Sequence, residues 1–173
     1  MAPPRPDLKI EALASHHDRG GFSCGVDGLD RYLRTQASQD VRRKANGVFV
    51  LVEPDNTDII LGYYTLCATA LAQGDVPAAA RKHVPRYPLV SATLVGRLAV
   101  SEVRQGERLG GMLLADAVQR AFASAATVGS SMLVVEAIND RAAAFYEGNG
   151  FVRLPDSLRL VLPMRAIQRL MER

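Results

Sequence analysis

The chain has 173 residues, of which 48% are hydrophobic and 23% are charged, and its formal net charge is +3. This composition is that of a globular protein, so we expect one domain over residues 1–173 that folds without disulfides or metal ions. No apolar run approaches the roughly 20 residues that cross a bilayer, and no apolar signal segment opens the chain, which predicts a cytoplasmic protein with no membrane partner. The two cysteines and three histidines lack the spacing of metal ligands, which predicts free thiols and no metal site.

The first half of the chain predicts an edge strand, a helix and a hairpin. Apolar and polar side chains alternate over residues 8–13, as is typical of an edge strand. Asp27 stands in an N-cap position before apolar residues that recur at every fourth position, which predicts a helix from there to about Arg43. Two apolar runs at 48–52 and 59–71, with a polar turn between them, predict an antiparallel hairpin.

The second half predicts a long loop followed by alternating strands and helices. Regular patterning stops over residues 72–87, so we expect a loop there. The later elements are expected as strands at 89–100, 132–137, 151–152 and 158–162, and helices at 109–126, 140–147 and 163–171. The short strand at 132–137 is apolar throughout, which indicates a parallel partner and burial on both faces. This order of elements predicts an α+β (mixed α/β) domain whose sheet is mixed and largely antiparallel.

Basic residues concentrate on the predicted N-terminal helix and in the long loop. They are Arg31, Arg34, Arg42, Arg43 and Lys44 in the helix, and Arg81, Lys82 and Arg86 in the loop. Arg31 and Arg42 are eleven residues apart, which places them within about 20° of each other on a straight helix. The sequence leaves two interpretations open: a solvated face with a basic C-terminal turn, or a surface that contacts phosphates. Arg97, on the predicted central strand, either meets a substrate phosphate or pairs with an acid.

Residues 91–114 place a glycine-containing turn between an apolar strand and an amphipathic helix. The first N–H groups of a helix have no intrahelical partner, and the aligned peptide dipoles make that end positive. Such a turn can therefore bind a phosphate group. Many α/β proteins contain this arrangement without using it, so the pattern alone predicts little.

Two segments in combination carry a resemblance to a known family. Residues 97–114, RLAVSEVRQGERLGGMLL, and residues 139–151, NDRAAAFYEGNGF, together resemble the GNAT superfamily of acetyl-CoA-dependent N-acetyltransferases. The resemblance implies the GNAT fold, whose central strand splays from its parallel neighbour, and acetyl-CoA as cosubstrate. The implied cofactor-binding residues are Leu98, Ala99, Val100, Gln105, Gly106, Glu107, Arg108, Leu109, Gly110, Gly111, Asn139, Ala142 and Phe145. Arg108 stands where the family prefers glycine, so either the turn geometry differs or an extra guanidinium meets phosphate.

The same resemblance implies that Tyr146 is the catalytic residue. A positioned phenol can donate its proton to the departing thiolate when the tetrahedral intermediate collapses. Without the resemblance, Tyr146 reads as a core aromatic like its neighbour Phe145. No Glu or His identifies itself as a general base, and an α-amine with a pKa near 8 needs none.

A closer resemblance covers nearly the whole chain. Residues 22–25, 29–33, 61–66, 96–100, 144–151 and 160–164 are similar to the GNAT toxins of bacterial toxin–antitoxin pairs. This implies acetylation of the α-amino group of aminoacyl-tRNA, inhibition of translation, a ribbon-helix-helix antitoxin and a homodimer. It gives the basic residues of the helix, the loop and Arg97 a tRNA-binding role. The alternatives are an N-acetyltransferase of a small amine or protein N-terminus, and a coenzyme-binding fold without turnover.

Overall fold

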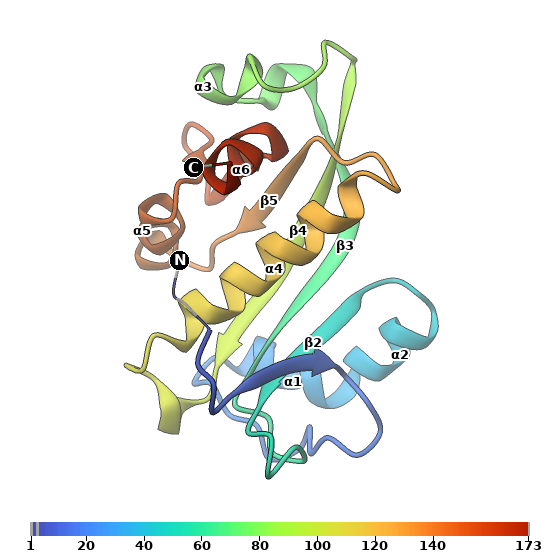
Figure 1. Ribbon diagram of the computed structural model, residues 1–173, viewed down its shortest axis with the longest axis vertical. Helices are drawn as coiled ribbons and strands as arrows, with labels where there is room; N and C mark the ends of the chain where they lie inside the picture. Colours follow the sequence, from blue (N-terminus) through green and yellow to red (C-terminus); the bar gives the residue numbers. More distant parts are fainter. Residues whose placement is uncertain (1, 3, 173) are drawn as a thin grey trace. The chain divides into compact units, whose positions relative to one another are not determined.

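The computed structural model describes residue 2 and residues 4–172, and its seven strands form one mixed sheet in the order β1-β2-β3-β4-β5-β7-β6 (Figure 1). The strands are β1 (Lys9–Ala12), β2 (Gly47–Val52), β3 (Gly62–Ala72), β4 (Leu89–Val100), β5 (Met132–Glu136), β6 (Val152–Arg153) and β7 (Arg159–Pro163). The helices are α1 (Asp27–Thr35), α2 (Ala37–Arg42), α3 (Ala78–Arg81), α4 (Leu109–Ala125), α5 (Asp140–Gly148) and α6 (Met164–Met171), with short 3-10 turns η1 (Gln73–Asp75) and η2 (Glu102–Arg104). This confirms the mixed α/β fold class.

The chain divides into two compact units, which are described separately below. The first holds residues up to 67 together with 97–117, and the second holds 68–96 and the chain from 118 onward. The expectation of one domain over the whole chain stays a prediction.

The first unit is built on an antiparallel three-stranded arrangement. β1 pairs with β2, and β2 pairs with β3 in the register Gly47↔Leu66 to Leu51↔Gly62. The predicted edge strand and hairpin are therefore confirmed, although β3 begins at Gly62 rather than at Ile59. Gly62 is required by packing, because a Cβ there would lie 2.9 Å from the carbonyl oxygen of Ala99 and 2.9 Å from Leu113 Cδ1.

The predicted helix over residues 27–43 is wrong in one respect: it is two helices. Gln36, with φ −120° and ψ −31°, separates α1 from α2. The apolar residues of this segment, Leu29, Leu33, Ala37 and Val41, all pack into one core cluster. A spacing of four residues drifts by about 40° per step on a straight helix, so the break at Gln36 brings all four to the same side. The shared face expected for Arg31 and Arg42 does not follow, since they lie on separate helices.

Asp27 is not the N-cap that the sequence suggested. The N-cap is Val26, which makes no side-chain capping bond. Asp30 in the first turn instead accepts the backbone N–H of Cys24 at 2.9 Å, so a carboxylate still ties the entering loop to the helix.

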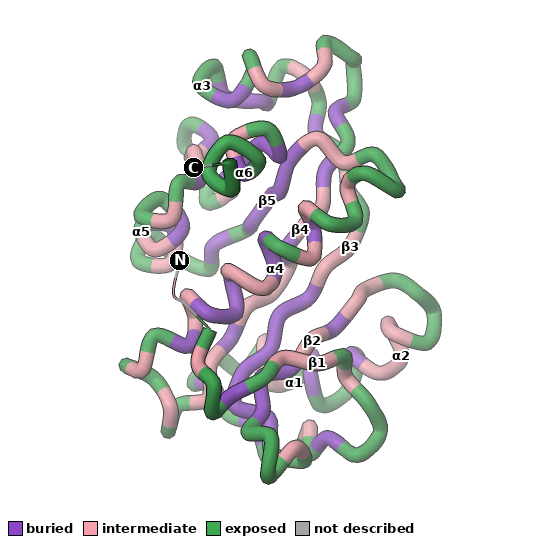
Figure 2. The backbone as a smooth tube through the Cα atoms, in the orientation of Figure 1, coloured by how far each residue is buried: buried purple, intermediate pink, exposed green. Residues whose placement is uncertain are grey.

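The second unit contains the parallel pair. β4 and β5 pair from Ala92↔Met132 to Val95↔Val135, and β5 pairs antiparallel with β7. Buried residues line β5, as expected for a strand covered on both faces (Figure 2). The ladder between β4 and β5 ends at Val95↔Val135, one residue before β5 itself ends, so the splay of the two strands stays a prediction.

The predicted loop over residues 72–87 is partly ordered into η1 and α3. Val76, Ala80 and Val84 from this segment are buried in the core cluster of the second unit. Pro77 has φ −58° at the start of α3 and is followed by three alanines, a favourable helix start that sequence periodicity could not reveal in so short a segment. Helix α4 matches its prediction closely, with Leu109, Leu113 and Ala117 buried.

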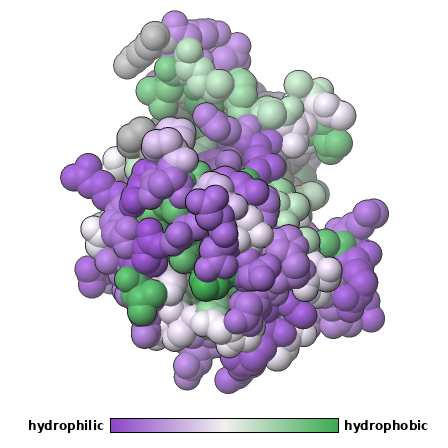
Figure 3. Space-filling model, turned by 60° about the horizontal axis from the view of Figure 1, so that its bottom comes forward, coloured by the Kyte–Doolittle hydropathy of each residue, from purple (hydrophilic) through white to green (hydrophobic). Residues whose placement is uncertain are grey.

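None of the helices in the described part of the chain is long and apolar enough to cross a membrane. Hydrophilic side chains prevail on the face shown in Figure 3, where hydrophobic residues occur in small separate groups. The large hydrophobic side chains that are most exposed, such as Val103 and Val128, come from turns.

Candidate active site

The turn between β4 and α4 displays backbone amides at the start of the long helix. After η2 the chain passes through Gly106 and Arg108, which both have positive φ, +87° and +62°. Among the described residues no backbone acceptor binds the N–H groups of Gly106, Glu107 or Arg108. The first N–H groups of α4 also lack intrahelical acceptors, and the helix dipole is positive there. This donor set fits a diphosphate, the group by which coenzyme A would be held.

Arg108 has the left-handed backbone conformation that would account for the glycine that the family prefers at this position. A φ of +62° is left-handed, and side chains with a Cβ adopt it at a cost of roughly 1 kcal/mol. The turn therefore has glycine-like geometry although the residue is arginine. The Arg108 side chain is exposed, so its contact with phosphate stays a prediction.

A chain of charges surrounds Glu107 in this turn. Its carboxylate pairs with Arg104 at 2.7 Å and with Arg5 at 3.2 Å, and Arg104 also pairs with Glu53 at 3.1 Å. The hydrogen bond from Arg104 lowers the pKa of Glu107, with a further contribution from Arg5. The two arginines thus offset the negative charge of the Glu107 side chain. Sequence reasoning missed Arg5, Arg104 and Glu53, because their pairing depends on residues far apart in the chain.

The side chain of Gln105 ties the turn to the strand. Its Nε2 donates to the carbonyl oxygens of Val100 and Cys24, both at 3.1 Å. Of the three strand residues predicted to pair with the pantetheine arm, Val100 therefore has its carbonyl already engaged, and the carbonyl of Ala99 faces Gly62. The role of Gln105 is a structural tie that sequence reasoning did not identify.

Tyr146 lies on α5 in the second unit and is 6% exposed. Its ring makes edge contacts with Phe145 and Phe151, at centroid distances of 5.2 and 5.7 Å. Burial raises the pKa of Tyr146 to about 12. The hydroxyl makes no hydrogen bond within the described residues. The structure thus presents a protonated phenol, held by two aromatic rings, whose O–H is not committed to another side chain.

The residues predicted beside Tyr146 have structural bonds of their own. Asn139 is the N-cap of α5, and its Oδ1 accepts the N–H of Ala142 at 2.8 Å. The carbonyl of Phe145 accepts from Asn149 Nδ2 at 2.8 Å. Asn139 and Ala142 thus satisfy each other in this state, which leaves the amide group of Asn139 as the donor that a pantetheine arm could use.

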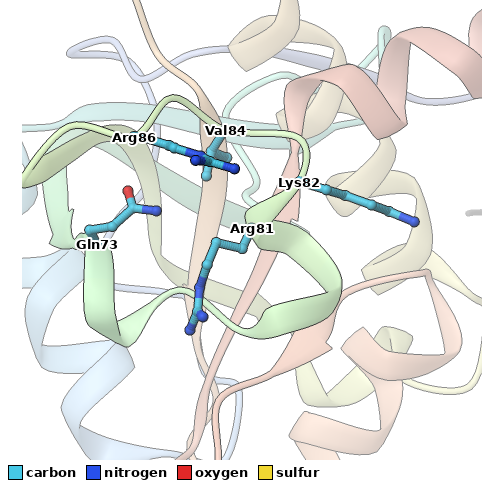
Figure 4. A pocket seen from close by; sticks show the side chains of 5 residues that line it. All are labelled: Gln73, Arg81, Lys82, Val84 and Arg86. Atoms are coloured by element: carbon cyan, nitrogen blue, oxygen red, sulfur yellow. The ribbon is translucent and has the colours of Figure 1, made fainter.

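The three basic residues of the long loop line a pocket of about 570 Å³ in the second unit. The full lining is Gln73, Arg81, Lys82, Val84 and Arg86, drawn in Figure 4. The Arg81 guanidinium donates to the carbonyl of Val76 at 2.9 Å, whereas the Lys82 side chain extends away from the other four (Figure 4). Burial lowers the pKa of the neighbouring His83, and the positive charges of Arg169, Lys82 and Arg165 lower it further. Arg165 and Arg169 on α6 are the cations that the loop-based prediction missed.

The basic residues of the first unit lie on α1, on α2 and just after it. Arg31, Arg34, Arg42, Arg43 and Lys44 are all exposed. Arg97 is half-buried, and the carbon of its guanidinium lies 3.5 Å from the centre of the Tyr32 ring. Within the described chain Arg97 forms no ion pair with an acid, so the pairing that the sequence left open is not seen.

Glu11, His16 and His17 form the one group of metal-type ligand atoms found among the described residues. His17 Nδ1 accepts the N–H of Ala14 at 2.9 Å, so the ring proton resides on Nε2, which donates to Glu11 at 2.8 Å. That tautomer leaves His17 without a lone pair for an ion. The cluster is therefore a hydrogen-bonded edge of β1, and its geometry does not fit a metal.

Residues 16–151 match the profile of the Acetyltransferase (GNAT) family. The chain belongs to the GNAT acetyltransferase family. Its sheet, its parallel strand pair and its strand–turn–helix at the start of α4 agree with this membership.

Three similar proteins place this acetyltransferase more narrowly. It is 34% identical over 154 residues to the tRNA-acetylating toxin of Mycobacterium tuberculosis (strain ATCC 25618 / H37Rv), covering 88% of this chain and 90% of that protein. It is 30% identical to AtaT complexed with acetyl-methionyl-tRNAfMet, with a TM-score of 0.87 and coverage of 95% and 99%. It is 29% identical to a tyrosine-to-phenylalanine mutant of the toxin AtaT bound to acetyl-CoA and the C-terminus of the antitoxin AtaR, with a TM-score of 0.81 and coverage of 96% and 99%.

Proposed function

We propose that this chain is a toxin that transfers the acetyl group of acetyl-CoA to the α-amino group of aminoacyl-tRNA and so blocks translation. The observation that carries the proposal is similarity along nearly the full length to a tRNA-acetylating toxin and to AtaT captured with an acetylated aminoacyl-tRNA. The presence in this chain of an amide-lined turn and of a buried, uncommitted phenol supports the enzymatic part.

The coenzyme is held by backbone groups more than by side chains. The amides from Gln105 to Gly111, with Arg108 near them, bind the diphosphate at the positive end of α4. Backbone groups of Leu98, Ala99 and Val100 and the amide of Asn139 bind the pantetheine arm, with Ala142 and Phe145 beside it. When bound, acetyl-CoA supplies the thioester whose carbonyl carbon is attacked.

Tyr146 acts as the proton donor to the leaving sulfur. A pKa of about 12 keeps the phenol protonated across the physiological range, so the donor is always loaded. The phenol protonates the sulfur as the carbon–sulfur bond breaks, and the proton that the attacking nitrogen loses on forming the amide restores the phenol. The attacking α-amine has a pKa near 8 and is partly neutral without a protein base.

Two groups of basic residues contact the phosphates of the acceptor. In the first unit these are Arg31, Arg34, Arg42, Arg43, Lys44 and Arg97, and in the second they are Arg81, Lys82 and Arg86. Contacts of this kind position an RNA without reading its sequence, which suits an enzyme that acts on the amino acid at its end. The exposure of the first group and the shared pocket of the second support this role.

The remaining parts of the proposal concern the setting of the enzyme. As a toxin of charged tRNA it acts in the cytoplasm, as a homodimer, and is neutralised by a small ribbon-helix-helix antitoxin. The structure of AtaT with the C-terminus of AtaR is consistent with antitoxin control in a similar protein.

The test is mass analysis of the aminoacyl adenosine released from charged tRNA after incubation with the protein and isotopically labelled acetyl-CoA. The proposal predicts one labelled acetyl group on the α-nitrogen, and none when the tRNA carries an α-hydroxy acid in place of the amino acid. If charged tRNA gained no labelled acetyl group while free amines or a peptide N-terminus did, the alternative acceptor class would be established.

A further inference from the structure

The surroundings of Arg97 form a connected aromatic arrangement within the first unit. Phe22 meets Tyr63 edge-on at 5.5 Å, Tyr63 stacks on Tyr32 at 6.4 Å, and the Arg97 guanidinium lies over Tyr32 at 3.5 Å. We call Phe22, Tyr63 and Tyr32 the aromatic column. Its members are at most 7% exposed, and Tyr63 is anchored by a 2.7 Å hydrogen bond from its hydroxyl to the carbonyl of Leu29. The ring beneath Arg97 is therefore fixed in place.

Asp40 lies near Arg97 and accepts its hydrogen bonds from other residues. The hydrogen bonds from Gln36 and Tyr32 lower the pKa of Asp40 and the charge of Arg97 lowers it further, yet Arg97 and Asp40 form no ion pair in the described chain. The carboxylate oxygens of Asp40 accept hydrogen bonds from three other side chains. Tyr32 Oη donates to Oδ2 at 2.8 Å, Asn46 Nδ2 donates to the same oxygen at 3.0 Å, and Gln36 Nε2 donates to Oδ1 at 2.9 Å.

A guanidinium has two distinct binding surfaces. Its flat face stacks on aromatic rings, and its edge carries five N–H donors that match the oxygens of phosphate. In this protein the face is occupied by Tyr32, and the edge of Arg97 donates to no described residue. Among the described residues the guanidinium nitrogens of Arg97 are not buried unpaired atoms, so the edge is open to solvent and accessible to an anion.

We propose that Tyr32 is a positioning residue: it holds Arg97 by the face of the guanidinium and keeps the N–H edge available for a phosphate of the acceptor RNA. This inference rests on the proposed function. The hydroxyl of Tyr32 has a separate role, which is to donate a hydrogen bond to the carboxylate of Asp40. The ring and the hydroxyl are therefore predicted to contribute differently to substrate binding.

The experiment is a double-mutant cycle on the full-length protein, with KM for charged tRNA and kcat measured at saturating acetyl-CoA. Tyr32→Leu removes the ring and is expected to raise KM roughly tenfold, the size of a partly desolvated cation–π contact, with kcat within twofold. Tyr32→Phe keeps the ring and is expected to hold KM within threefold. In an Arg97→Gln background, Tyr32→Leu is expected to raise KM less than twofold further, because the group that it positions is gone.

The matched control is Phe22→Leu, which removes a ring from the same aromatic column without touching Arg97. It is expected to lower thermal stability as Tyr32→Leu does and to leave KM unchanged. Should Tyr32→Leu fail to fold by circular dichroism, Tyr32→Met carries the same expectation with a side chain of closer volume.

Each outcome decides the matter. A full tenfold effect of Tyr32→Leu in the Arg97→Gln background, or equal KM changes for Tyr32→Leu and Phe22→Leu, means that the ring acts only through folding and overturns the inference while the proposed function stands. A wild-type protein that transfers no acetyl to charged tRNA overturns the proposed function, and this inference with it.

Discussion

Gly106 and Arg108 share one turn and one backbone conformation, so they provide a matched pair at the scale of a single residue. Both have left-handed φ, which glycine adopts freely and arginine does not. We expect Arg108→Gly to raise the free energy of unfolding by up to about 1 kcal/mol and Gly106→Ala to lower it by about 1 kcal/mol. Urea unfolding measures both. The two changes in the free energy of unfolding must have opposite signs. A destabilised Arg108→Gly variant would mean that the arginine side chain makes a contact that outweighs its backbone strain.

The ionisation of Tyr146 can be followed without any substrate. Because burial raises its pKa to about 12 from an ordinary value of 10, folding favours the protonated phenol, and this contribution to stability is lost as pH rises between those values. Ultraviolet difference titration of wild type against Tyr146→Phe is expected to show no phenolate from this residue below pH 11. A difference signal with a midpoint near 10 would show that the phenol is solvated like a free tyrosine.

The ion pair between Arg104 and Glu107 predicts opposite effects from neutralising its two members. Arg104→Gln leaves the carboxylate less compensated beside the diphosphate and is expected to raise KM for acetyl-CoA several-fold, whereas Glu107→Gln is expected to lower it. Steady-state kinetics at two ionic strengths measures both, and the differences should shrink at high salt. If KM for acetyl-CoA changed in the same direction in both variants, the cause would be the geometry of the turn rather than its charge.

Packing of whole elements depends on the close approach at Gly62. A methyl group there would lie 2.9 Å from the Ala99 carbonyl and from Leu113, and neither a strand backbone nor a fully buried leucine can retreat cheaply. We expect Gly62→Ala to lower the free energy of unfolding by about 2–3 kcal/mol, measured by urea denaturation. The control is Gly74→Ala, where nothing lies within 4 Å and no change beyond about 0.5 kcal/mol is expected. Loss of stability at both positions alike would refute the packing argument.

The elements also show what the sequence could and could not predict. Strand β4 and helix α4 were predicted nearly to the residue, because each is long and strongly periodic. The break at Gln36 was missed because a four-residue apolar spacing imitates a helix while drifting around it. The ion pair between Arg5 and Glu107 joins residues 102 positions apart. The contact of Arg97 with Tyr32 likewise joins residues that are far apart in the sequence. Local pattern carries no information about such contacts.

At the scale of the whole molecule, binding of charged tRNA is expected to be strongly dependent on salt. Replacing Arg81, Lys82 and Arg86 by glutamine should raise KM for charged tRNA and reduce the slope of log affinity against log salt by about 2, at roughly 0.7 for each phosphate that is no longer neutralised. Lys9→Gln, an exposed cation of the edge strand paired with Glu11, is the control and should alter neither value. An unchanged slope in the triple variant would exclude the pocket of the second unit from the RNA-binding surface.

The central claim, that the phenol of Tyr146 protonates the leaving sulfur during acetyl transfer to charged tRNA, is tested most directly by the single-turnover rate. At saturating acetyl-CoA and enzyme in excess over charged tRNA, Tyr146→Phe is expected to transfer acetyl at least roughly 100-fold more slowly than wild type, with an unchanged Kd for acetyl-CoA. Equal single-turnover rates for the two proteins would contradict the account.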